Sequence, residues 1–118
     1  MAIGEYKLAV QRGSVGAYAL VRLEAVVHDG PLVVETDAIE TRWRAAAVFG
    51  VTYAQERLRR VGFDEALCVR ILEVGWMHSD TTGMAVAMAA YHAACAAFGQ
   101  PADPGVRRRD DGIYEFPA

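Results

Sequence analysis

Residues 83–98 constrain the fold of this 118-residue chain more than any other part of the sequence. The segment begins at Gly83, is followed by Gly99, and contains His92 as its one strongly polar side chain. Its alanines are Ala85, Ala87, Ala89, Ala90, Ala93, Ala94, Ala96 and Ala97. A helix that is apolar all round must be buried on more than one side, and a membrane span needs roughly 20 apolar residues. We therefore expect this helix to pack on a sheet and against a neighbouring helix or a partner chain, which predicts a homo-oligomer formed through Gly83–Phe98.

The first third of the chain has the pattern of three strands. Gly13 and Gly16 supply the positive φ that a tight turn needs between the first two. Asp29 and Gly30 are a hairpin signal before the third. Apolar and β-branched residues predict the strands at residues 6–11, 17–28 and 32–36.

A first helix is expected over residues 38–61. Asp37 is typical of an N-cap, and Glu40 three positions later would complete a capping box. Gly62 suits the position just after the helix. Apolar residues recur three and four apart and predict one buried stripe, made of Ile39, Trp43, Ala46, Gly50, Ala54, Leu58 and Val61. A fourth strand is expected at residues 66–76.

The predicted order is therefore β-β-β-α-β-α. We expect an α+β fold, a two-layer α/β sandwich in which both helices cover one face of a mixed sheet. Residues 1–100 would form this single domain, since compact domains have about 100–150 residues. Residues 101–118 are rich in proline, glycine and charge, and we expect a loop and a C-terminal tail.

Composition and charge exclude several classes of protein. With 53% hydrophobic residues the chain is not intrinsically disordered, and a net charge of −3 argues against a dedicated nucleic-acid binder. Cys68 and Cys95 lie in apolar segments and are expected to be free thiols rather than a disulfide framework. Glu5, Lys7 and Arg12 stand where a signal peptide would have its apolar core. We expect a cytoplasmic protein with no membrane partner.

Two stretches of the chain resemble domain IV of elongation factor G and the related ribosomal protection proteins. The first looks like the opening turn and strand of that domain, through Lys7, Gln11, Gly13, Gly16, Tyr18, Ala19, Val21 and Leu23. The second is similar to its next hairpin and helix, through Asp29, Gly30, Glu35, Asp37, Glu40, Trp43, Arg44, Ala46 and Ala47. With the strand that follows, the resemblance covers residues 7–74.

The resemblance implies the same sandwich with a left-handed β-α-β crossover, which agrees with the order of elements predicted above. The sequence contains no G-x-x-x-x-G-K-[ST] phosphate loop, so we expect a binding domain without GTPase activity. Val34 stands where the family has its tip histidine.

The polar loop before the last helix is the strongest candidate site. His78 would act as an acid or base that Asp80 orients, and His28 is a third catalytic candidate if the fold brings it near them. Free N–H groups at a helix start can bind an anion, but the same side chains also suit ordinary N-capping. The candidate ligand-binding residues are Ser79, Thr81 and Thr82. The spacing of histidine, cysteine and carboxylate residues matches no zinc site, and no metal or cofactor is expected.

Two functions follow from these features. The first is a stand-alone binding or assembly module resembling domain IV of elongation factor G, oligomeric, with the ribosome or RNA as a lesser expectation for its partner. The alternative is a small metabolic enzyme or ligand-binding protein that uses residues 78–82 at the start of the last helix.

Overall fold

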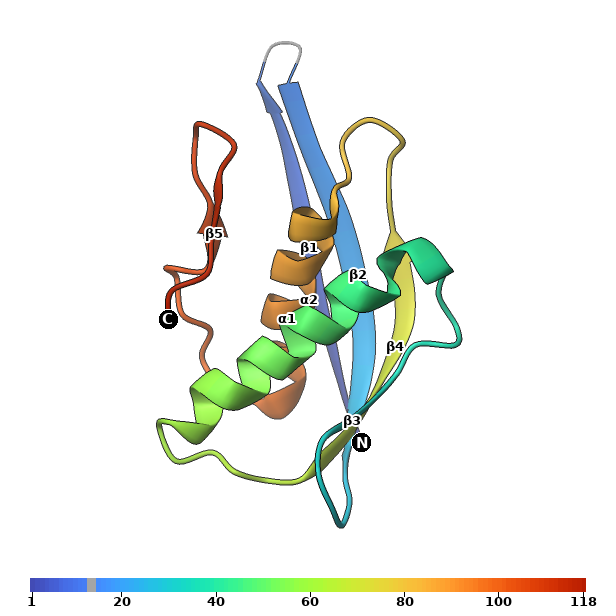
Figure 1. The fold of residues 1–118 in the computed structure, drawn as a ribbon, viewed down its shortest axis with the longest axis vertical. Coiled ribbons are helices and arrows are strands. Elements are labelled where there is room, and N and C mark those ends of the chain that lie inside the picture. The colour runs from blue at the N-terminus through green and yellow to red at the C-terminus, as the bar shows by residue number, and fades with distance from the viewer. Residues whose placement is uncertain (13–14) are drawn as a thin grey trace.

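The computed structural model describes residues 1–12 and 15–118 (Figure 1). Four strands form one sheet in the order β1-β2-β4-β3, and two helices lie across one face of it. The strands are β1 (Ala2–Arg12), β2 (Val15–Val27), β3 (Val33–Glu35) and β4 (Leu67–Gly75). The helices are α1 (Thr41–Arg59) and α2 (Gly83–Phe98). A separate pair, β5 (Arg107–Arg108) and β6 (Tyr114–Glu115), follows α2. The predicted two-layer sandwich and its order of elements are confirmed.

The sheet is mixed, as the sequence predicted. β1 and β2 form a long antiparallel hairpin whose pairing runs from Ala2 opposite Ala25 to Arg12 opposite Val15. β2 also pairs antiparallel with β4, whereas β3 pairs parallel with β4 and α1 makes the crossover between them. Of the turn predicted at residues 13–16, Gly13 and Ser14 lie outside the described residues. Gly16 lies in β2 opposite Gln11 and does not have a positive φ, so the role predicted for it in the turn is wrong.

The core lies between the sheet and α2, which approach each other unusually closely. A Cβ atom on Gly4 of β1 would lie 1.9 Å from the backbone oxygen of Ala93, so only glycine permits this contact. A Cβ atom on Gly50 of α1 would lie 2.3 Å from the backbone oxygen of Ala87. Helix α2 is thus packed against the sheet on one side and α1 on another. The predicted burial of α2 on more than one side is confirmed, and the surfaces that cover it belong to the same chain.

The start of α1 differs from the prediction. The residue before the helix is Glu40, whose backbone is extended and whose side chain makes no capping hydrogen bond. The N–H of Ile39 donates to the carbonyl of Thr36 at 3.2 Å, so residues 36–39 form a turn and the predicted Asp37–Glu40 capping box is wrong. At the other end α1 stops at Arg59, which leaves Val61 outside the buried stripe and 76% exposed.

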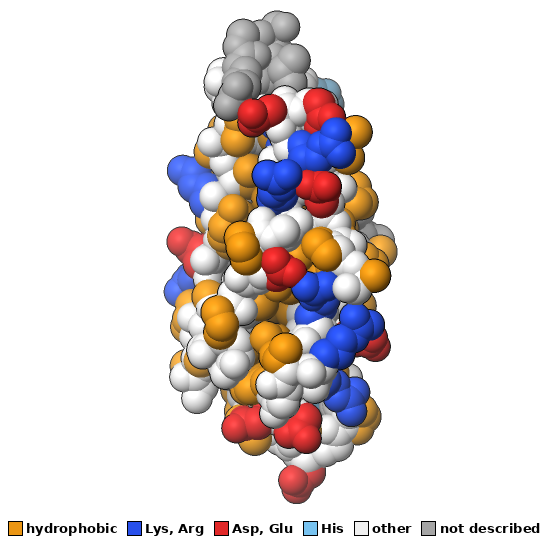
Figure 2. Space-filling view, turned by 90° about the vertical axis from the view of Figure 1, so that its left-hand side faces the viewer, with side chains coloured by type: hydrophobic (Ala, Val, Ile, Leu, Met, Phe, Trp, Pro, Cys, Tyr) orange, Lys and Arg blue, Asp and Glu red, His pale blue; other side chains and the backbone are white. Residues whose placement is uncertain are grey.

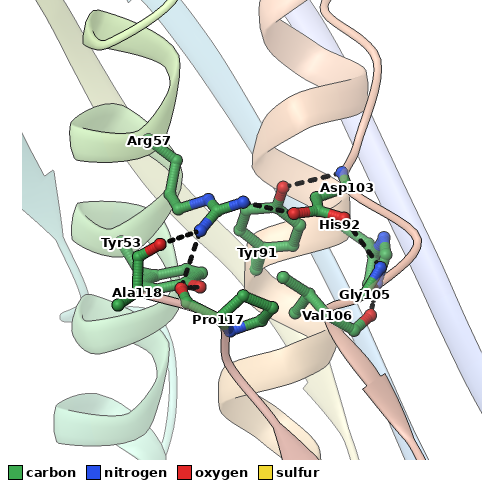
Figure 3. A network of polar contacts seen from close by, with 9 residues as sticks. All are labelled: Tyr53, Arg57, Tyr91, His92, Asp103, Gly105, Val106, Pro117 and Ala118. Atoms are coloured by element: carbon green, nitrogen blue, oxygen red, sulfur yellow. Dashed lines mark hydrogen bonds and ion pairs between the residues drawn. The ribbon is translucent and has the colours of Figure 1, made fainter.

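Residues 101–118, here called the C-terminal strap, pack back onto the helices (Figure 3). The strap contains the β5–β6 hairpin, and its Val106 is only 1% exposed. Tyr91 of α2 accepts a hydrogen bond from the backbone N–H of Asp103 at 2.9 Å, and the ring of His92 contacts the carbonyl of Val106 at 2.7 Å. The strap therefore covers the flank of α2 that neither the sheet nor α1 covers.

Candidate functional site

The end of β1, the start of β2 and the loop at residues 76–82 before α2 lie at the same end of the molecule (Figure 1). We call this region the hairpin end. The backbone N–H of Tyr18 donates to the carbonyl of Asp80 at 3.0 Å. The Thr81 hydroxyl donates to the carbonyl of Tyr18 at 2.6 Å and accepts from the N–H of Met77 at 2.9 Å. These bonds fasten the loop to β2, so the loop has a fixed position beside the hairpin.

Residues of the first stretch of resemblance gather at the hairpin end. A Cβ atom on Gly16 would lie 2.7 Å from a carboxylate oxygen of Asp80 and 2.7 Å from the amide oxygen of Gln11, which explains the glycine at this position. The ammonium group of Lys7 lies 5.9 Å from the centre of the Tyr18 ring, within reach of a cation–π interaction.

A shallow, mostly apolar hollow of about 240 Å³ separates the hairpin from the loop. Its lining comes from both, namely Ala9, Val10, Gln11, Ala17, Tyr18, Met77 and Asp80. The hollow therefore joins two features that lie far apart in the sequence, the paired strands β1 and β2 and the polar loop before α2.

The three catalytic candidates do not form one site. His28 follows β2, where its N–H bonds the carbonyl of Ala66, and its ring nitrogen contacts the carbonyl of Pro31 at 3.0 Å. His78 lies beyond the opposite end of β4, whose nine residues span roughly 30 Å. His78 is exposed, and none of the contacts among the described residues joins its ring to the Asp80 carboxylate. The structure therefore keeps His28 apart from the other two candidates.

In two of the three candidate ligand-binding residues, the side-chain hydroxyl makes hydrogen bonds to the backbone that hold the loop or cap α2. Thr81 is 9% exposed and uses its hydroxyl to fasten the loop, as described above. Thr82 is the N-cap of α2, and its hydroxyl accepts a hydrogen bond from the N–H of Ala85 at 3.2 Å. Ser79 is exposed. The capping interpretation thus accounts for Thr82.

The most perturbed titratable groups lie under the strap rather than at the hairpin end. Burial raises the pKa of Tyr91 to about 12 and lowers the pKa of His92 below its ordinary value. His92 stacks on Tyr6 of β1 with 4.5 Å between ring centres. Perturbed pKa values mark functional sites only when the groups face a cleft, and these groups are packed in the structure.

The thiols and carboxylates offer no metal site in the part of the chain that is described. No group of three or more histidine, cysteine, aspartate or glutamate side chains there is arranged to hold a metal ion. Cys68 and Cys95 are free, as predicted, and burial raises the pKa of both thiols. No helix of the described residues is long and apolar enough to cross a membrane.

One surface was not predicted from the sequence, the outward side of α1. Val48 is 37% and Phe49 47% exposed, although both are large apolar side chains. The predicted stripe of α1 described only the buried face of the helix. The outward residues Ala45, Phe49 and Thr52 also recur at spacings of four and three, and this pattern was the available signal.

Comparison with known proteins shows the fold alone. No protein-family model and no curated protein matches the chain. A crystal structure of a protein from Thermus thermophilus is similar, with 21% sequence identity and a TM-score of 0.66. The match covers 79% of this chain and 15% of that one, so this chain spans a small part of the length of the protein it resembles. At this identity the similarity extends to the two-layer α/β architecture.

Proposed function

We propose that this chain is a stand-alone binding module, built on the plan of domain IV of elongation factor G, that docks on its partner through the hairpin end. The observation that carries the proposal is the convergence of Gln11, Gly16 and Tyr18 with the loop at Asp80 around one hollow. The bonds from Thr81 to the backbone fix this surface in advance. A fixed surface loses little conformational entropy on binding, which favours affinity.

The chemistry of the hairpin end supports a partner that contains RNA, such as the ribosome. Lys7 supplies a cation beside the Tyr18 ring, and Met77 is 51% exposed at the rim of the hollow. A cation and an aromatic ring together suit a phosphate and an adjacent base. The overall charge of −3, and the mixture of acidic, basic and apolar groups on the strap-side face that Figure 2 shows, support local contacts rather than a broad basic surface on that face.

Co-sedimentation with ribosomes at low and raised salt tests the proposal. The chain is expected to sediment with ribosomes at low salt and to be released as the salt concentration rises, because phosphate contacts release counterions. Lys7→Glu and Met77→Asp change exposed side chains and should each weaken binding by roughly tenfold, a loss of about 1.4 kcal/mol.

Arg70→Glu is the matched control, since Arg70 is also exposed, lies on β4 beside β3 and makes the same change of charge as Lys7→Glu. This variant should bind like the unmodified chain. Absence of co-sedimentation at low salt would contradict a ribosomal partner, and equal loss in all three variants would contradict docking through the hairpin end.

A further inference from the structure

The outward side of α1 is an apolar surface between two grooves. Phe49 lines both of them. The groove toward α2 has a volume of about 460 Å³ and is lined also by Ala45, Ala46, Thr82, Gly83, Met84 and Ala87. The groove toward the strap, of about 200 Å³, is lined also by Thr52, Tyr53, Glu56, Arg57, Arg60 and Ala118. In Figure 1, α1 passes in front of α2 and no other element crosses its outward side.

Charged residues flank this apolar surface in an order that reverses in sign about Phe49. On the N-terminal side come two acids and then a base, Asp37, Glu40 and Arg42; on the C-terminal side come an acid and then two bases, Glu56, Arg59 and Arg60. All six are exposed, and none of them has an ion-pair partner among the described residues. The charges are therefore available to a partner.

The innermost pair of opposite charges is also symmetric in position. Arg42 lies seven positions before Phe49 and Glu56 seven after it. Seven residues make about two helical turns, so both residues lie on the same face of α1 as Phe49. An antiparallel copy of the same helix, centred on Phe49, would place Arg42 beside Glu56 of the second copy and Glu56 beside its Arg42. A parallel copy would place like charges together.

We propose that a second copy of this chain packs on α1, antiparallel and about a two-fold axis near Phe49. The Phe49 rings and Val48 side chains of the two copies fill the centre of the interface, and the small side chain of Ala45 lets the two helices approach closely. Glu56 faces Arg42 of the second copy, and the reciprocal pair forms because a two-fold interface uses the same patch twice. The guanidinium of Arg42 is held over Trp43 and Trp76, 4.6 Å from each ring centre, which fixes it at the edge of the patch.

A charge-exchange experiment tests both the partner and the register. In Arg42→Glu and in Glu56→Arg, each homodimer would carry two like-charge contacts, so each variant alone should associate roughly tenfold more weakly than the unmodified chain. Mixing the two variants restores both opposite-charge pairs in a heterodimer. Light scattering coupled to size-exclusion chromatography at tens of micromolar is expected to show a dimer for the unmodified chain, weaker association for each variant, and a dimer for the mixture.

Val48→Asp tests the apolar centre without touching the Phe49 ring, which also packs on the strap residue Phe116. It should give a monomer, whereas the control Ile113→Asp, on a side chain 53% exposed in the β5–β6 hairpin, should leave the dimer intact. Circular dichroism establishes that each variant is folded. A monomeric unmodified chain would overturn the proposal, as would a dimer that survives Val48→Asp or a mixture that does not recover. Ribosome binding is scored separately, so the two proposals can fail independently.

Discussion

Gly50 shows how a single residue sets the distance between the two helices. A Cβ atom there would lie 2.3 Å from the Ala87 oxygen and 2.8 Å from the Ala90 Cβ. The first of these is a backbone atom of a buried helix, so it cannot move aside cheaply. The glycine costs about 1 kcal/mol of helix propensity relative to alanine, and the close contact between α1 and α2 offsets that cost.

Gly50→Ala should therefore destabilise the protein although alanine favours helix. We expect the free energy of unfolding in urea, followed by circular dichroism, to fall by roughly 1–3 kcal/mol. Gly83→Ala is the matched control, because its Cβ would meet only the Ala46 Cβ at an ordinary 4.0 Å. That variant should be as stable as the unmodified chain or slightly more so. An unchanged stability of Gly50→Ala would mean that the helices can separate without cost.

The elements differ in how far the sequence could predict them. The bounds of α2 were predicted as Gly83–Phe98 because a long apolar pattern is closed by Gly99, whose φ is +70°. The start of α1 could not be fixed, because Asp37 and Glu40 match a capping box that the turn at residues 36–39 prevents. The strap escaped prediction for another reason. Strands of two residues are too short to show periodicity, and Val106 gains its burial from α2, which is distant in sequence.

The candidate site was predictable only in part, for a topological reason. The sequence places His28 after one strand and His78 after another, but their distance depends on which ends of the strands meet. Antiparallel pairing of β2 with β4 puts the end of β2 beside the start of β4, and therefore separates the two histidines. The contact of Gly16 with Asp80 likewise needs the three-dimensional register.

Arg57 fastens the strap as an element, and removing it should loosen the strap. Its guanidinium pairs with Asp103 and donates to the carbonyls of Pro117 at 2.7 Å and Ala118 at 2.9 Å (Figure 3). Arg57→Ala should lower the free energy of unfolding by roughly 1–2 kcal/mol and speed amide exchange at Val106. The control Arg107→Ala breaks an exposed pair with Glu115, for which about 0–1 kcal/mol is expected. Equal exchange rates in the two variants would contradict this role of Arg57.

His92 connects three parts of the structure, since it belongs to α2, stacks on Tyr6 of the sheet and contacts the Val106 carbonyl of the strap. Its burial lowers the pKa of the imidazole below the ordinary 6.5. The unfolded chain therefore binds a proton at a higher pH than the folded chain does. Below pH 6.5 the unfolded state binds more protons, so the free energy of unfolding must fall as the pH falls toward the folded-state pKa.

This dependence should appear in the cooperative unfolding of the complete chain. Urea midpoints measured between about pH 7.5 and pH 5 should decrease with falling pH. His92→Gln should reduce that slope whatever its effect on the midpoint at pH 7.5, because the amide does not titrate. His78→Gln, at an exposed position, should leave the slope as it is. If His92→Gln kept the full slope, the pH dependence would have to arise from other groups, and His92 would connect sheet, helix and strap by packing alone.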